Sequence, residues 1–146
     1  LAVEEGRYNK RHDDKKFTNE NVASVLSLII NRGEVTDLSD YEVDHIYPKT
    51  KEYIDELTKQ LDDPPKIHRI GNLQLLKKEV NRRKSDSAPA DWCDSLSDAQ
   101  FDNQKQSNIY PDGWEGGLAN YVDFVSNREE KIVDHLCEEY VSNNTE

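Results

Sequence analysis

Hydrophobic and polar positions along the chain change period several times, and these changes mark the predicted elements. Between residues 22 and 30, apolar side chains recur at three- and four-residue spacing. This spacing predicts an amphipathic helix that begins near Thr18 or Asn19 and ends by Gly33. Residues 41–46 have the composition of a short strand, and residues 51–61 return to helical spacing.

The second half of the chain is predicted to be mostly helical after one further strand. A Gly-Asn turn leads into a short strand over residues 73–76, and helical composition then continues to about Asp86. The Ser-Ala-Pro run at residues 87–89 is expected to end this unit. A weak polar helix is predicted over residues 97–107, and a long amphipathic helix over residues 118–141.

These elements predict one α+β domain with several helices around a small strand-containing core. A chain of 146 residues is long enough to bury a modest core. Residues 1–17 are mostly charged and are expected to be a linker or the tail of a missing N-terminal region, which leaves residues 18–146 as the domain. The chain begins with Leu1 and contains no Met, so we expect it to be a fragment of a longer protein.

The sequence favours a cytoplasmic location in a prokaryotic cell. It contains no apolar run of membrane-spanning length and no signal-peptide pattern at its amino end, so no membrane partner is expected. The two cysteines, Cys93 and Cys137, stand far apart without a CxxC pair. This spacing indicates neither a zinc knuckle nor a disulfide framework, and it fits a reducing compartment.

The charge of the chain is unevenly distributed. The net charge of −11 argues against polyanion binding, which depends on Lys and Arg displacing counterions. Between Lys66 and Lys84, however, seven basic residues stand against one acidic residue, so this segment carries +6 and the remaining residues carry −17. One basic patch is therefore predicted on an acidic body, either as a solvated helix face or as a substrate-binding face.

Three residues in the middle of the chain have the chemistry that phosphodiester hydrolysis requires. Asp44 and Asn81 supply the oxygen ligands that a hard cation such as Mg²⁺ prefers. His45 projects from the opposite side of the strand from Asp44 and can take a proton from the attacking water, because an imidazole is largely neutral at cellular pH. On a helix, Lys77, Lys78 and Lys84 share the face of Asn81, which favours a helix lying along a phosphate backbone.

The ordered stretches "VDHIYPKT" and "IGNLQLLKKEVNRRKSD" resemble the ββα-metal core of HNH, or His-Me finger, endonucleases. The chain is particularly similar to the C-terminal domain of GmrSD-type restriction endonucleases, and to related nickase effectors of phosphorothioate-sensing systems. In the GmrSD-type domain a DHIxP stretch is followed by GNLxLL and by an Asn on a helix. The motifs cover about residues 41–86, and residues 87–146 form a helical part that includes a terminal helix with an Arg, a weaker similarity.

The resemblance implies a role for each matching residue. His45 is expected to be the general base, Asp44 and Asn81 the metal ligands, and Asn72 a brace for the loop that holds His45. The last letter of HNH is Asn81 here rather than His, and an amide oxygen favours Mg²⁺, with Mn²⁺ as the alternative, over zinc or nickel. The expected contacts to the DNA backbone are Arg69, Lys77, Lys78, Arg82, Arg83 and Lys84.

The leading functional hypothesis is a metal-dependent DNA endonuclease or nickase domain of a restriction or anti-phage defence protein. Its partners would be DNA and an N-terminal nucleotide-hydrolysing or sensor domain of the same protein. The alternatives are a module that binds nucleic acid without cleaving it, and an RNA-cleaving toxin built on the same motif. His68, Trp92 and Trp114 are interpreted as surface or core residues rather than as site residues.

Overall fold

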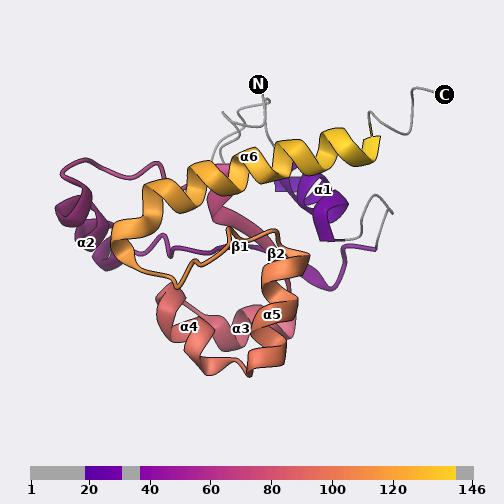
Figure 1. Ribbon diagram of the computed structural model, residues 1–146. Coiled ribbons are helices and arrows are strands. Elements are labelled where there is room, and N and C mark those ends of the chain that lie inside the picture. The colour runs from indigo at the N-terminus through magenta and orange to yellow at the C-terminus, as the bar shows by residue number, and fades with distance from the viewer. Residues whose placement is uncertain (1–18, 31–36, 141–146) are drawn as a thin grey trace.

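The computed structural model describes residues 19–30 and 37–140, which form an α+β fold around a two-stranded antiparallel sheet (Figure 1). The predicted fold class is confirmed at this level. The predicted linker over residues 1–17 and the predicted helix end at Gly33 lie outside the described residues. Of the helices in the described part, none is long and apolar enough to cross a membrane.

The observed elements follow the order expected from the sequence, with one addition. They are α1 (Asn19–Ile30), β1 (Tyr41–His45), α2 (Lys51–Leu61), the 3-10 turn η1 (Ile70–Asn72), β2 (Leu73–Lys77), α3 (Lys78–Lys84), α4 (Pro89–Ser95), α5 (Asp98–Ser107), the 3-10 turn η2 (Leu118–Asn120) and α6 (Tyr121–Tyr140). In Figure 1, α6 runs along one side of the sheet, whereas α3, α4 and α5 gather on the other side.

The addition is α4, which begins where the sequence predicted an end. Pro89 occupies the first turn of this helix, where its missing N–H group would have had no helical partner and its fixed φ suits the helix. Trp92 and Cys93 on α4 are buried, and so is Trp114, which confirms the interpretation of the two tryptophans as core residues. The next helix, α5, begins at a capping box formed by Ser97 and Gln100.

The two strands pair so that residues far apart in the chain stand opposite each other. Asp44 lies opposite Gln74, and His45 lies opposite Leu73. Because side chains alternate between the faces of a strand, Asp44 and Gln74 share one face of the sheet and His45 and Leu73 share the other. Helix α3 begins directly after β2 at Lys78, so the order β1–β2–α3 forms a compact ββα unit.

Hydrophobic clusters fix the sheet between its helices. On one side, residues of α1 and α6 pack against β2 and η1; the buried members of this cluster are Val22, Leu26, Ile29, Ile70, Leu73, Leu75 and Ile132. A second cluster, rich in aromatic residues, surrounds Tyr47, whose ring centroid lies 5.0 Å from that of Tyr121 and 5.5 Å from that of Phe124, both on α6. The segment that follows β1 is therefore held rigidly by the core.

Arg128 on α6 holds the turn that leads into β2. Its side chain is completely buried (0 % exposed) and its Nη1 group donates to the carbonyl oxygens of Ile70, Gly71 and Leu73, at 3.1, 3.0 and 2.6 Å. Its Nε group donates to the carbonyl oxygen of Asn108 at 3.0 Å. Burial lowers the pKa of the guanidinium to about 10, so the group stays charged near neutral pH. One side chain thus ties α6 to the start of β2.

Gly71 allows this close approach of α6 to η1. A Cβ atom placed on Gly71 would lie 2.4 Å from the backbone oxygen of Val125, a distance that no side chain tolerates. The Gly in the Gly-Asn turn is therefore required by the contact with α6 rather than by the turn itself.

Candidate active site

Asp44, His45 and Asn81 meet at one pocket of about 220 Å³ at the end of β1. Asp44 and His45 are 8 % and 6 % exposed, and they come from the last two positions of the strand. Asn81 comes from α3. The residues around the pocket are Val43, Asp44, His45, Pro48, Lys49, Asn81, Ser85 and Asp86. The structure therefore brings together the three residues to which the sequence assigned chemistry.

The Asp44 carboxylate is held by two buried neighbours. Lys84 places its ammonium group 3.3 Å from Oδ1 and 3.1 Å from Oδ2, and Gln74 donates from Nε2 to Oδ2 at 2.9 Å. Lys84 also donates to the carbonyl oxygen of His45 at 3.0 Å. Burial raises the pKa of Asp44 above its ordinary value, while the charge of Lys84 and the hydrogen bond from Gln74 oppose the rise. The Lys84 ammonium is the counter-ion that this buried carboxylate needs.

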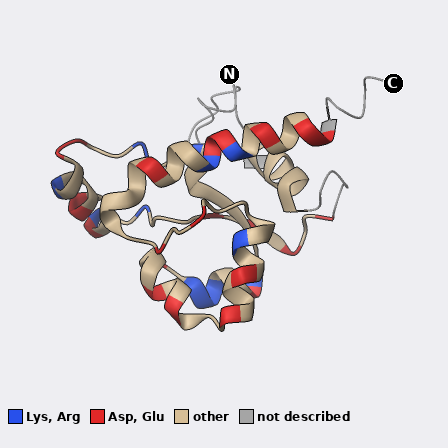
Figure 2. Ribbon diagram, viewed as in Figure 1, with Lys and Arg blue, Asp and Glu red and all other residues tan. Residues whose placement is uncertain are grey.

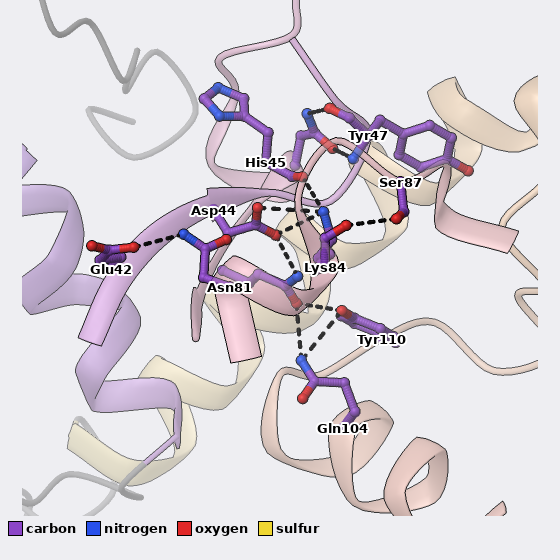
Figure 3. A network of polar contacts seen from close by, with 11 residues as sticks. Glu42, Asp44, His45, Tyr47, Asn81, Lys84, Ser87, Gln104 and Tyr110 are labelled. Atoms are coloured by element: carbon purple, nitrogen blue, oxygen red, sulfur yellow. Dashed lines mark hydrogen bonds and ion pairs between the residues drawn. The ribbon is translucent and has the colours of Figure 1, made fainter. Parts of the chain in front are cut away.

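A second layer of hydrogen bonds fixes Gln74 from α5 and the loop after it (Figure 3). The Gln74 carbonyl oxygen accepts from Gln104 Nε2 at 3.0 Å and from the hydroxyl group of Tyr110. Gln74 is 0 % exposed, so its donors and acceptor must be satisfied within the protein. These contacts connect α5 to the Asp44 carboxylate through the side chain of Gln74.

Asn81 reaches the pocket with its orientation fixed by β1. Its side-chain Nδ2 donates to Glu42 Oε2 at 2.8 Å. Figure 3 shows the amide oxygen of Asn81 on the side that faces Asp44. Two oxygens of different chemistry, a carboxylate and an amide, are thus presented to the same pocket.

His45 lies on the other side of the strand and pairs with a second histidine. Its Nε2 lies 3.0 Å from Nδ1 of His68, and the ring centroids are 5.1 Å apart in an edge-on arrangement of 75°. In Figure 3 the His45 ring points away from the Asp44 carboxylate. A hydrogen bond between two ring nitrogens needs one donor and one acceptor, so this contact couples the tautomers of the two rings.

Asn72 is completely buried (0 % exposed) and contacts backbone rather than the pocket. Its Nδ2 donates to the carbonyl oxygens of Tyr47 at 3.0 Å and Ile67 at 2.9 Å, and its Oδ1 accepts from the N–H of Tyr47 at 2.8 Å. These bonds join the chain that follows His45 to the chain that precedes His68. Asn72 therefore lies in the position expected of a residue that holds this loop in place.

The basic residues predicted to contact DNA divide into two groups. Lys77, Arg82 and Arg83 are exposed and Lys78 is half-buried, all at the end of β2 or on α3. Figure 2 shows this basic stretch of α3 flanked by acidic positions on α4 and α5. These four residues form what we call the α3 basic face.

The other two predicted DNA contacts do not belong to the α3 basic face. Lys84 is 1 % exposed, so its prediction as a surface contact is wrong, because its ammonium group lies buried against Asp44. Arg69 is ion-paired through Nη2 and Nε to the Glu129 carboxylate on α6, sixty residues away in the sequence, and its side chain is 33 % exposed. A contact of Arg69 with DNA stays a prediction.

The donor set of the pocket fits a hard cation. Within residues 19–30 and 37–140 there is no group of three or more His, Cys, Asp and Glu residues that could hold a metal ion. A site that binds through many nitrogen or sulfur ligands is therefore not built in the described part of the chain. Asp44 and Asn81 offer oxygens, and Mg²⁺ is commonly held by few protein oxygens with water and phosphate completing its shell.

Three residues that contact Asn81, Asp44 and His45 were missed by the sequence-based prediction. Glu42 precedes Asp44 by two positions, and the strand period alone would have placed the two carboxylates on one face. Gln74 is a polar residue inside the apolar run "LQLL", which is a signal of a buried polar role. His68 gave no such signal, because its contact with His45 depends on the fold of the loop.

A family model described as the C-terminal domain of GmrSD restriction endonucleases matches residues 3–135. The chain belongs to this family. The match confirms the resemblance predicted from the sequence, and it spans all the residues of the pocket and the α3 basic face. None of the curated proteins compared with the chain matches it. Membership in the GmrSD C-terminal domain family identifies the chain, at a coarse level, as a nuclease part of a restriction system.

Proposed function

We propose that this GmrSD-type domain is a metal-dependent DNA endonuclease of the HNH class, with a ββα-metal core over residues 41–86. The observation that supports it best is that Asp44 and His45 on β1 line the same pocket as Asn81 on α3. Strand β2, which pairs with β1 and leads directly into α3, connects the two elements. The family match supports the coarser part of the proposal, a nuclease of restriction-endonuclease type.

In this mechanism His45 acts as the general base. If Nε2 carries the proton and donates it to His68 Nδ1, the other ring nitrogen of His45 is the one that accepts a proton from the attacking water. Neutral imidazole is the form that can do this. His68 then orients the base, and Asn72 fixes the two loop segments that carry the histidines.

Asp44 and Asn81 would hold the metal ion, with Mg²⁺ proposed first and Mn²⁺ second. When bound, such an ion supplies positive charge that stabilises the charge developing on the phosphate and on the leaving oxygen. Lys84 and Gln74 keep the Asp44 carboxylate in place, and they do so from the protein side of the pocket. The carboxylate has further lone pairs beyond those that these two neighbours use.

The α3 basic face is proposed to bind the DNA backbone beside the pocket. Lys77, Lys78 and Arg82 lie within four positions of Asn81 in the chain, which supports a phosphate contact near the proposed metal site. Arg83 lines a separate pocket with Trp92 of α4, so its contact would lie farther along the DNA backbone. Contacts of this kind position a duplex without reading its bases. We therefore propose that target choice depends on a nucleotide-hydrolysing or sensor domain N-terminal to this one, and that the protein acts in the cytoplasm.

Plasmid cleavage tests the proposal directly. The chain is incubated with supercoiled plasmid and with structured RNA, each with Mg²⁺, with Mn²⁺ or with chelator. Metal-dependent conversion of supercoiled plasmid to open circles is the expected result, because one pocket cuts one strand at a time. His45→Ala, Asp44→Ala and Asn81→Ala should each abolish it, whereas Lys59→Ala on the exposed part of α2 should not.

The same experiment separates the alternatives. Cleavage of RNA with intact plasmid would replace the proposal by an RNA-cleaving toxin. Binding of DNA without cleavage under any metal condition would replace it by a non-cleaving module. A His45→Ala variant that cuts as fast as the parent chain would refute the proposed base.

A further inference from the structure

The contact between Asn81 and Glu42 joins α3 to β1 beside the proposed metal ligands. Asn81 Nδ2 donates to Glu42 Oε2 at 2.8 Å (Figure 3). Glu42 is half-buried and stands two positions before Asp44, so both carboxylates project from the same face of β1. Asp44 already has Lys84 as its ionic partner, whereas Glu42 contacts the amide of Asn81.

The chemistry of the two groups fixes which end of the amide faces the pocket. An ionised carboxylate only accepts hydrogen bonds, and an amide has a donating NH₂ end and an accepting oxygen end. Glu42 can therefore bind only the NH₂ end of Asn81. The oxygen end is left on the opposite side, where Figure 3 shows it facing Asp44.

An asparagine ligand needs such a partner more than an aspartate does. Both oxygens of a carboxylate can bind a cation, so rotation of the group by half a turn changes little. Rotation of the Asn81 amide would instead present NH₂ hydrogens to the cation, which is repulsive. A side chain that binds the NH₂ end removes this alternative before the cation arrives, as hydrogen bonds behind metal ligands commonly do.

We propose that Glu42 is a positioning residue of the metal site: it binds the NH₂ end of Asn81 and so directs the amide oxygen to the cation held with Asp44. This inference rests on the proposed function, because it presupposes a cation between Asp44 and Asn81. Glu42 itself does not bind the cation. Its contribution is the orientation of a neighbouring ligand.

Binding of Mn²⁺ alone, followed by calorimetry or electron paramagnetic resonance without DNA, tests the proposal. Glu42→Ala should weaken binding by about tenfold or more, the range found when the partners behind metal ligands are removed. Glu42→Gln should bind within about threefold of the parent chain, because its Oε1 still accepts from Asn81 whereas its negative charge is gone. Glu79→Ala is the matched control, since it removes an exposed carboxylate from α3 and should change nothing.

A double-variant cycle completes the experiment. In an Asn81→Ala background, Glu42→Ala should add no further loss of Mn²⁺ affinity, because the group that it orients is absent. Two results would overturn the inference: unchanged affinity in Glu42→Ala, or equal losses in Glu42→Ala and Glu42→Gln, which would assign the effect to charge or to direct ligation.

Asp44→Ala distinguishes failure of this inference from failure of the proposed function. If Asp44→Ala keeps the Mn²⁺ affinity of the parent chain, the proposed metal site is wrong and the Glu42 inference falls with it. If Asp44→Ala loses binding while Glu42→Ala keeps it, only the role of Glu42 is wrong. Thermal denaturation of every variant without metal shows that each one folds.

Discussion

Lys84→Met tests whether the ion pair under the pocket stabilises the fold by charge compensation. The substitution keeps a long side chain but removes the ammonium group that lies 3.1 and 3.3 Å from the Asp44 oxygens. Lys84 is 1 % exposed and Asp44 is 8 % exposed, so water compensates only part of the lost charge. The Asp44 carboxylate would remain buried without a counter-ion.

The magnitude follows from the separation and the burial. Opposite unit charges about 3 Å apart attract by about 5 kcal/mol at an effective dielectric constant of about 20, and desolvation of both groups offsets part of this. Removing one partner of a buried pair typically costs about 3–5 kcal/mol. We expect the free energy of unfolding of Lys84→Met to fall by this amount, measured by urea denaturation in the presence of chelator.

A surface ion pair provides the control. Lys51 lies 2.8 Å from Asp55, closer than Lys84 lies to Asp44, but the Lys51 side chain is 86 % exposed. Lys51→Met should therefore leave stability nearly unchanged. Mg²⁺ should restore more stability to Lys84→Met than to the parent chain, because a bound cation replaces the missing charge. Equal, small decreases in the free energy of unfolding of the two Met variants would refute the reasoning. It would also be refuted if Lys84→Met lowered the free energy of unfolding by the same amount when Asp44 is replaced by Asn.

Three further predictions address the scaffold, the buried thiol and the DNA contacts. Gly71→Ala should destabilise the fold by about 3 kcal/mol, because its Cβ would lie 2.4 Å from a backbone oxygen of α6. Gly117→Ala is the control in thermal denaturation, because its Cβ would meet only a side chain, at 3.2 Å. Equal decreases in Tm for the two variants would contradict the argument. Burial raises the pKa of the Cys93 thiol from 9.0 to about 11. The folded state therefore keeps a proton that the unfolded state releases, and stability should fall between about pH 9 and 11, by at most about 1.4 kcal/mol per pH unit for this group. In Cys93→Ala that part of the slope should be absent, as denaturation at several pH values would show. Lys78→Ala should weaken DNA binding and reduce its dependence on salt concentration, whereas Lys59→Ala should change neither, as measured by fluorescence anisotropy. An equal salt dependence of binding for the parent chain and both variants would exclude Lys78 from the interface.

Local patterns in the sequence were sufficient to predict most of the elements. The period of apolar residues placed α2 at Lys51–Leu61, as observed, because that period reports directly which face is buried. The strand period placed Asp44 and His45 on opposite faces, and the register with β2 agrees. Two segments separated by 36 positions could be joined at one site only through the family resemblance of their motifs.

The partners of individual side chains were not predictable in the same way. Lys84 has the composition of a surface residue, but its ammonium group pairs with a carboxylate forty positions earlier in the chain. Arg69 likewise pairs with Glu129 on the last helix. Such contacts depend on how helices cross the sheet, and local composition contains no information on that. The start of α4 was missed for a different reason, because proline is common both after a helix end and in the first turn of a helix. Here α3 already ends at Lys84, and Pro89 begins α4.

The contacts of the Arg128 guanidinium have a consequence for the order in which the elements of this domain fold. Three carbonyl oxygens at the entry to β2 take their hydrogen bonds from a residue that leaves the ribosome more than fifty positions later. During synthesis, the carbonyl oxygens at the start of β2 therefore gain these hydrogen bonds only after α6 has been made. A nascent or truncated chain that stops short of this arginine contains Asp44, His45 and Asn81 but lacks the donor that holds the turn before β2, so we expect the pocket to form only after α6 has been made.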